Sequence, residues 1–264
     1  MTPHKPRKRF GQHFLHDNSI VQRMVQTLSI QSNEQLIEIG PGQGALTSAL
    51  IASKADVTAI ELDRDLLPLL QQQFAGENNF HLIQADALSV DYCALQKEGR
   101  KLRVLGNLPY NISTPILFHL LKQMHCIKDM CFMLQKEVVD RLCAQAGGSD
   151  YGRLSVMVQL ACKTEKLFVV KPGAFRPPPK VDSAIVLLTP HPSPPVQIDD
   201  AGIFQALVRQ AFSQRRKTLR NNLRGWLGAD TMNKLGIDPG RRAETLQLAE
   251  FAILSNAVKT IPEH

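Results

Sequence analysis

The sequence lacks the features that mark membrane and secreted proteins. No apolar run approaches the roughly 20 residues that a helix needs to cross a bilayer. The basic stretch 5–9 is followed by polar residues, so it opens no signal peptide. We therefore expect a cytosolic protein. No repeat at a solenoid period is present either, which argues against repeat architectures.

Cysteine pairs with the spacing of metal ligands are also missing. The five cysteines are scattered, and no two of them form a Cys-x-x-Cys motif. Because they lie in apolar surroundings, we expect reduced packing residues without metal or redox roles. These cysteines are Cys93, Cys126, Cys131, Cys143 and Cys162. His13 and His16 are spaced like a helical pair, but no third ligand accompanies them, so no metal site is predicted.

Acidic residues are absent from one long segment. The 264 residues include 31 basic and 24 acidic ones, for a formal charge of +7, yet residues 201–229 contain no acidic residue. A basic surplus this concentrated predicts a polyanionic partner such as RNA. The alternative, a solvated helix face, is less favoured because such faces usually mix charges of both signs. We assign RNA binding to Arg215, Arg216, Lys217 and Arg220.

Short apolar segments alternate with helical ones from residue 35 onward. This alternation predicts an α/β domain with a parallel sheet and helices on both faces. The predicted strands are 36–39, 57–62, 80–84, 102–105 and 129–134, with a closing pair at 167–170 and 184–188. The predicted helices are 19–28, 45–51, 65–74, 114–123, 135–144 and 155–162.

The proline-rich segment 189–195 is the predicted domain boundary, because proline fixes φ and removes a backbone donor. Beyond it, helical spacing recurs at 203–212, 218–227, 232–235 and 246–258. We expect an N-terminal arm at residues 1–18, an α/β domain at 19–190 and a small all-α domain at 191–264. The arm contains Phe10, Phe14 and Leu15, which need burial against the main domain.

Four successive predicted strands end in residues that suit a nucleoside ligand. The glycine loop 40–44 lets backbone approach a ligand at a helix N-terminus, although it lacks the G-x-G-x-x-G spacing of the dinucleotide fingerprint. Glu61 ends the second strand, where it can accept hydrogen bonds from ribose hydroxyls. Asp86 follows the third strand and suits an adenine amino group. Asn107 follows the fourth, so we expect these groups to meet at the carboxyl edge of the sheet.

The segment Asn107-Leu108-Pro109-Tyr110 suits an adenine whose amino group reacts. The amine lone pair is delocalised into the ring, so the nitrogen is a poor nucleophile. Acceptors on the Asn107 side chain and the Leu108 carbonyl would bind its two N–H groups and stabilise the positive charge that develops. Pro109 fixes the turn, while Tyr110 and Phe175 offer stacking faces. The alternatives are a plain strand-closing turn and, for Phe175, a core residue under a proline-rich loop.

These motifs resemble the ribosomal RNA adenine methyltransferases, which use S-adenosylmethionine. The similarity runs in order from about residue 7 to 250 and includes the segments 9–15, 38–42, 60–63, 106–113, 175–181 and 215–218. The segments 175–180 and 215–218 make the chain most similar to the bacterial small-subunit branch of the family. They are less typical of the large-subunit branch, which confers macrolide resistance.

The resemblance implies a Rossmann-like, seven-stranded S-adenosylmethionine-dependent methyltransferase domain and a small all-α C-terminal domain. It implies transfer of two methyl groups to N6 of each of two adjacent adenosines in the 3′-terminal hairpin of small-subunit rRNA. The expected partner is a pre-30S particle in the cytoplasm, bound by a monomer late in assembly. An idle assembly factor is a further alternative, disfavoured because Glu61, Asp86 and Asn107 are all present.

The resemblance also implies a role for each site residue. The residues expected to bind S-adenosylmethionine are His13, Leu15, Gly40, Glu61, Asp86 and Asn107. Those expected to act on the target adenine are Asn107, Leu108, Tyr110 and Phe175. Many family members carry asparagine where this chain has His13, so that contact is expected through the backbone or through a different side-chain atom.

Overall fold

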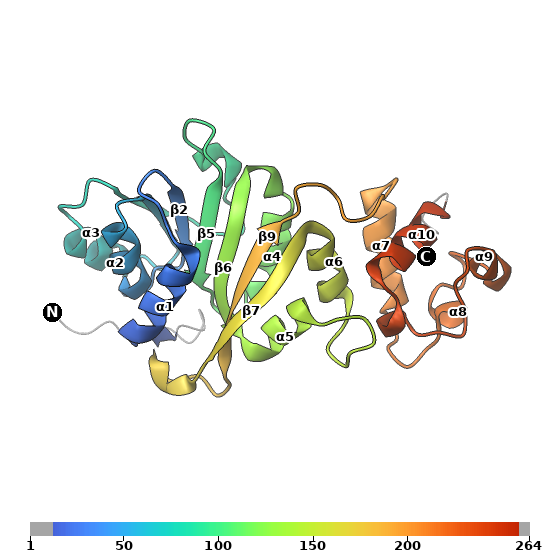
Figure 1. Ribbon diagram of the computed structural model, residues 1–264. Helices are drawn as coiled ribbons and strands as arrows, with labels where there is room; N and C mark the ends of the chain where they lie inside the picture. Colours follow the sequence, from blue (N-terminus) through green and yellow to red (C-terminus); the bar gives the residue numbers. More distant parts are fainter. Residues whose placement is uncertain (1–12, 259–264) are drawn as a thin grey trace. The chain divides into compact units, whose positions relative to one another are not determined.

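The computed structural model describes residues 13–258 and divides into two compact units (Figure 1). The first unit contains the residues up to Val139 together with Glu165–Pro190. The second contains Asp140–Thr164 together with the residues from His191 onward. A division therefore falls at the proline-rich segment, whereas segment 140–164, which the prediction placed in the α/β domain, groups with the C-terminal helices. Residues 1–12 of the predicted arm lie outside the described residues.

A seven-stranded sheet organises the first unit, in the order β4-β3-β2-β5-β6-β9-β7. Its strands are β2 (Gln35–Ile39), β3 (Asp56–Glu61), β4 (Phe80–Gln84), β5 (Leu102–Asn107), β6 (Ile127–Gln135), β7 (Cys162–Val170) and β9 (Ser183–Pro190). The strands from β4 to β6 pair in parallel, and β9 is antiparallel to β6. The predicted Rossmann-like sheet is thereby confirmed, including the closing pair β7 and β9.

Helices of the first unit cover this sheet and build its core (Figure 1). They are α1 (Asn18–Leu28), α2 (Ala45–Ala52), α3 (Leu67–Gln73), α4 (Ser113–Leu121) and α5 (Lys136–Cys143), the last of which crosses into the second unit. Asp17 begins α1 by accepting the Ser19 backbone N–H at 2.9 Å, as expected of an N-cap. Met24 of α1 and Leu50 of α2 pack with Leu36 of β2 in one buried cluster.

The second unit is helical around an apolar core. Its helices are α6 (Arg153–Ala161), α7 (Ala201–Ala211), α8 (Leu219–Asn222), α9 (Ala229–Lys234) and α10 (Leu248–Asn256). Phe204 and Phe251 are fully buried in the core. The predicted helix 218–227 is too long, because α8 ends at Asn222 and Gly225 adopts a φ of +87°, which interrupts helical geometry.

Two cysteines differ from the expectation of reduced packing residues. Cys93 and Cys126 form a disulfide, with their Cα atoms 5.5 Å apart. They lie in the short helices η2 (Cys93–Leu95) and η3 (Met124–Cys126), and the two cysteines are 33 residues apart in sequence. Only the packing of these two turns brings the sulfurs together, so the sequence spacing carried no signal. Cys131 and Cys162 are free and buried, as predicted.

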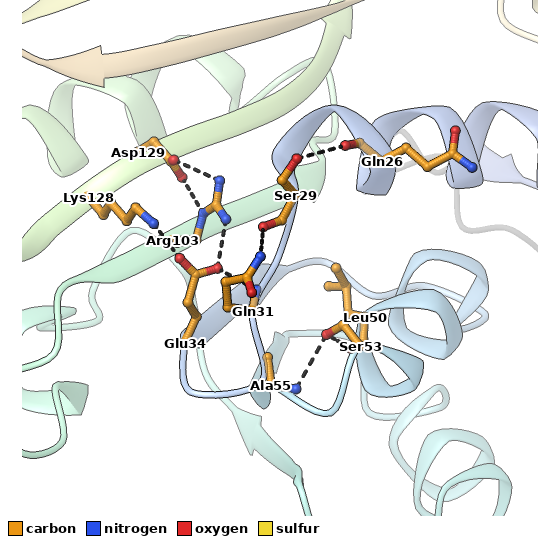
Figure 2. Close-up of polar contacts among 10 residues, drawn as sticks. All are labelled: Gln26, Ser29, Gln31, Glu34, Leu50, Ser53, Ala55, Arg103, Lys128 and Asp129. Carbon is orange, nitrogen blue, oxygen red and sulfur yellow. Dashed lines mark hydrogen bonds and ion pairs between the residues drawn. The ribbon is translucent and has the colours of Figure 1, made fainter.

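A buried network of charged residues joins the amino ends of three strands (Figure 2). The Arg103 side chain at the start of β5 is 5% exposed. Its Nε and Nη2 atoms each donate to the Asp129 carboxylate of β6 at 2.9 Å. Its Nη1 donates to Glu34, just before β2, at 2.7 Å. Lys128 also donates to Glu34, so both carboxylates are paired.

Candidate active site

A pocket of about 260 Å³ lies at the carboxyl ends of the parallel strands. The glycine loop after β2, Glu61 of β3, Asp86 after β4 and Asn107 of β5 all line it. The structure thus brings together the four strand ends that the sequence singled out. The pocket volume is close to the lower end of the ~300–1,000 Å³ that is usual for small-molecule sites.

The backbone around the pocket requires glycine at two places. Gly42 has a φ of +58°, and a Cβ on it would lie 3.0 Å from the Phe14 ring. Gly106 in β5 is even more restricted, because a Cβ there would lie 2.5 Å from the carbonyl oxygen of Ile39. These glycines let β2, β5 and the arm approach closely, which shapes the pocket wall.

Glu61 and Asp86 are held by backbone N–H groups. The Glu61 carboxylate accepts from Gly42 N at 3.3 Å and from Asp63 N at 2.8 Å. Burial, the largest influence, raises the pKa of Glu61 despite these hydrogen bonds. Asp86 Oδ1 accepts from Leu88 N at 2.9 Å. Both carboxylates are therefore fixed in orientation before a ligand enters.

Glu38 is a pocket residue that the sequence reasoning missed. It belongs to β2, is fully buried, and accepts a hydrogen bond from the Thr47 hydroxyl at 2.7 Å. Burial raises the pKa of Glu38 to about 7, with the Thr47 hydrogen bond opposing and the Glu61 charge adding to the rise. The available signal was a lone carboxylate inside an otherwise apolar strand, two residues before the glycine loop.

Asn107 is oriented by the N-terminal arm. Its Nδ2 donates to the His13 carbonyl at 2.9 Å, and because a carbonyl only accepts, this bond leaves Oδ1 as the free acceptor. In the described part of the chain, no hydrogen bond reaches Asn107 Oδ1 or the Leu108 carbonyl oxygen. Leu108 N donates to the Met133 carbonyl at 3.2 Å, which anchors the turn to β6.

The two aromatic residues expected to stack on the base differ in position, because Tyr110 lines the pocket and Phe175 is buried outside it. Tyr110 lines the pocket, and its hydroxyl is 2.8 Å from the Ser183 hydroxyl in β9. The His13 ring centroid lies 5.5 Å from that of Tyr110, and His13 Nδ1 is hydrogen-bonded to the Pro177 carbonyl at 2.7 Å. Phe175 does not line the pocket. It is 2% exposed and pairs with Leu15 between β1 (Phe14–Leu15) and β8 (Phe175–Arg176).

The four residues assigned to RNA binding lie in the second unit. Arg215, Arg216, Lys217 and Arg220 are all exposed. Arg215 Nη2 donates to the Ser149 carbonyl of the same unit. The other three make no ion pair among the residues that the structure describes, so their charges are available to a partner.

The sheet order, the antiparallel β9 and the pocket at the glycine loop define a Rossmann-like S-adenosylmethionine-dependent methyltransferase. Residues 3–260 match the family described as "Ribosomal RNA adenine dimethylase". The chain belongs to this family.

Individual relatives agree with this assignment. The chain is 53% identical over 259 residues to "Ribosomal RNA small subunit methyltransferase A" of Pseudomonas aeruginosa, covering 98% of this chain and 97% of that protein. It is 52% identical over 256 residues to the protein of that name in Alcanivorax borkumensis, covering 97% of this chain and 91% of that protein.

Two solved structures share the fold. A dimethyladenosine transferase from Plasmodium falciparum superposes with a TM-score of 0.78 at 27% identity, covering 92% of this chain and 96% of that one. The 23S rRNA methyltransferase ErmE has a TM-score of 0.72 at 24% identity, covering 94% of this chain and 100% of that one, and shows the shared fold alone. Among the described residues, no helix is long and apolar enough to cross a membrane.

The pocket residues fit S-adenosylmethionine, the methyl donor of this family. The cofactor carries a sulfonium, an ammonium and one carboxylate, so its net charge is positive. Glu38, Glu61 and Asp86 line the pocket, and their carboxylates would suit that charge and would offer acceptors for the ribose and adenine N–H and O–H groups. Burial raises the pKa of both Glu38 and Glu61. A cationic ligand in the pocket would stabilise the ionised form of each carboxylate.

Replacing Glu38 by glutamine is expected to stabilise the free protein but weaken cofactor binding. The folded-state pKa of about 7 exceeds the ordinary value of 4.5, so stability is lost as pH rises through that window. At pH 8 the loss is on the order of 3 kcal/mol, which glutamine avoids. Cofactor affinity should fall about tenfold or more, because a charge-assisted contact of ~1.5–3 kcal/mol is removed.

Thermal denaturation at acid and alkaline pH and calorimetric titration with S-adenosylmethionine would measure both effects. Below the ordinary pKa, the variant and the parent protein should have equal stability. Equal stability at pH 8 as well would mean that Glu38 is not held neutral in the folded chain.

Proposed function

We propose that this protein transfers methyl groups from S-adenosylmethionine to N6 of two adjacent adenosines in the 3′-terminal hairpin of small-subunit rRNA. The product is a pair of dimethyladenosines. The observation that carries the proposal is the pair of free acceptors, Asn107 Oδ1 and the Leu108 carbonyl, beside an acidic pocket. The identity of 53% to the small-subunit methyltransferase of Pseudomonas aeruginosa supports the choice of rRNA.

Bound S-adenosylmethionine supplies an electrophilic methyl group on its sulfonium. Asn107 and Leu108 accept hydrogen bonds from the adenine amino group and favour the tetrahedral, positively charged nitrogen of the transition state. Tyr110 holds the base by stacking, and its hydroxyl is fixed by Ser183. The amine loses its proton to solvent after the methyl group arrives, so no strong general base is required.

The protein is proposed to act as a monomer on a pre-30S particle in the cytoplasm. The exposed basic residues of segment 215–220 support an rRNA partner. The competing target, large-subunit rRNA, has only the fold similarity to ErmE in its favour. Relatives named for the small subunit cover almost the whole chain, which favours the small-subunit target.

The direct test is mass spectrometry of rRNA after incubation of assembling subunits with the protein and isotopically labelled S-adenosylmethionine. Dimethyladenosine at two adjacent positions near the 3′ end of small-subunit rRNA is the expected result. Label confined to large-subunit rRNA would transfer the proposal to the competing target. No label in either subunit would favour the idle assembly factor.

Neutralising Arg215, Arg216 and Lys217 together by glutamine is expected to weaken RNA binding. If each cation contacts a phosphate of single-stranded RNA, the slope of log affinity against log salt should decrease by about 0.7 for each one. Binding measured over a salt series would test this. The matched control neutralises Lys163, Arg209 and Lys234, which are also exposed in the second unit. Equal losses in both variants would remove the special role of segment 215–217.

The stacking role expected of Phe175 predicts that Phe175→Ala lowers kcat by about 10–100-fold while changing the KM for cofactor less, because stacking contributes ~1–3 kcal/mol. Its buried position beside Leu15 predicts instead that the main effect is a loss of thermal stability. The control is Phe175→Leu, which keeps an apolar side chain in the buried position but lacks the aromatic face. Methyl transfer and thermal stability are measured for both variants. If leucine restores methyl transfer together with stability, Phe175 is a core residue and does not stack on the base.

A further inference from the structure

The second unit contains a hollow of about 450 Å³ whose lining comes entirely from residues 220–229. The polar side chains that line it are Arg220, Asn221 and Arg224. All three are exposed and form no ion pair or side-chain hydrogen bond within the described residues. Trp226, the sole tryptophan of the chain, also lines the hollow. The lining therefore combines two guanidiniums, an amide and an aromatic ring.

The hollow is preformed by hydrogen bonds to neighbouring segments. Arg220 N donates to the Pro239 carbonyl at 2.9 Å, and Leu219 N donates to the Arg241 carbonyl at 2.8 Å. Asn222, at the end of α8, donates from its side chain to the Ala211 and Gln214 carbonyls. These bonds hold the backbone of α8 in place without engaging the side chains that line the hollow, so binding there needs little ordering of the chain.

Trp226 is the most unusual of the lining residues. Its side chain is 9% exposed, and its indole Nε1 is buried without a hydrogen-bond acceptor among the described residues. A buried donor without an acceptor destabilises the free protein, so an acceptor supplied by a ligand would be favoured. Aromatic rings and guanidiniums are also the groups on which unpaired bases stack.

We propose that this hollow binds one unpaired nucleotide of the rRNA, with its phosphate on Arg220 and Arg224 and its base against Trp226. The proposal rests on the proposed rRNA function and adds a base-sized site to the phosphate contacts of segment 215–217. Two guanidiniums match the phosphate, which accepts several hydrogen bonds. An acidic protein could form ion pairs with the two guanidiniums, but its carboxylates would not stack on the Trp226 ring. Asp230, the nearest carboxylate in sequence, does not line the hollow.

Trp226 makes the proposal directly measurable, because all tryptophan fluorescence of the chain comes from this residue. The full-length protein is titrated with a short unstructured oligoribonucleotide, with adenosine monophosphate, with inorganic phosphate and with polyglutamate. A saturable change in Trp226 fluorescence with the oligoribonucleotide is expected. Saturation by adenosine monophosphate at equal concentration would make the hollow a free-nucleotide site, and saturation by polyglutamate would make it a protein-docking site. Either result would overturn the proposal.

The variant that tests the site carries Arg220→Gln and Arg224→Gln, and its matched control carries Lys163→Gln and Arg209→Gln. Oligoribonucleotide affinity should fall tenfold to a hundredfold only in the first. Its salt slope should fall by about 0.7, because the one phosphate that both guanidiniums bind is no longer neutralised. Circular dichroism checks that both variants fold. Equal affinities of the two variants would overturn the proposal.

Methyl transfer separates this site from the general function. Each variant is also assayed for S-adenosylmethionine binding and for methylation of small-subunit rRNA. The hollow variant should bind the cofactor normally and methylate rRNA with a raised KM. Normal methylation kinetics in the hollow variant would overturn the proposed nucleotide site and leave the proposed methyltransferase function untouched. Absence of methylation by the parent protein would instead overturn the proposed function.

Discussion

Alanine at position 107 is expected to lower methyl transfer to adenine by about 10²–10³-fold or more. That range is the usual effect of deleting one preorganised polar group that stabilises transition-state charge. The substitution removes Oδ1, which is the free side-chain acceptor, and leaves the Leu108 carbonyl alone to bind the amine. It also removes the donor to the His13 carbonyl, so the arm loses one contact to β5. Single-turnover transfer from labelled S-adenosylmethionine measures the effect.

Two further variants separate these causes. Asn107→Asp keeps an acceptor for the amine but places a carboxylate oxygen beside the His13 carbonyl, so the arm contact is lost while an acceptor remains, with one negative charge added. Asn78→Ala removes an exposed amide away from the pocket and serves as the control. RNA binding should remain nearly normal in all three. Dimethyladenosine formation by Asn107→Ala at a rate close to the parent protein would rule out the acceptor mechanism.

The strand ends could be predicted because they depend on local sequence. Glu61, Asp86 and Asn107 follow short apolar runs, and parallel strands present their carboxyl ends at one edge of the sheet. The pocket could therefore be predicted from the alternation of strands and helices, together with the rule that the carboxyl ends of parallel strands lie at one edge of the sheet. Their individual roles toward the cofactor and the base remain predictions for the variants described above.

Features that depend on contacts between distant segments could not be predicted. The bond from Asn107 to the His13 carbonyl joins residues 94 positions apart, and it comes from a backbone group that no motif encodes. Glu38 was missed because a lone acid in an apolar strand is a weak signal, which does not by itself show that the side chain lines the pocket. The grouping of segment 140–164 with the C-terminal helices likewise depends on packing, as when Val156 joins the cluster around Phe204.

The arm gains a more definite role from these contacts. Leu15 and His13 line the pocket, His13 also binds the Pro177 carbonyl, and β1 pairs with β8. One short segment, residues 13–15, therefore contacts both Asn107 and the loop 175–180. We infer that it aligns the acceptor amide before the base arrives, which reduces the reorganisation needed during transfer.

Arg103→Ala is expected to destabilise the first unit by about 3–5 kcal/mol, because it leaves the Asp129 carboxylate buried without Arg103 and leaves Glu34 with Lys128 as its remaining cationic partner. The melting temperature of that unit should fall by roughly 10 °C. Circular dichroism should detect the loss, whereas fluorescence of Trp226, which lies in the second unit, should change less. The double variant Arg103→Leu with Asp129→Leu should recover much of the loss, since an apolar pair removes the unpaired charge.

The pH dependence of this effect has a definite sign. Burial alone would raise the pKa of Glu34, but hydrogen bonds from Lys128, the Gln31 backbone and Arg103 outweigh it and lower the pKa below 4.5. A lowered folded-state pKa contributes stability above the ordinary value, and that stability is lost as pH falls through the folded value. The parent protein and Arg103→Ala should therefore converge in stability at acid pH. A difference that stays constant from neutral to strongly acid pH would mean that Arg103 acts through packing of its aliphatic stem and not through its charge.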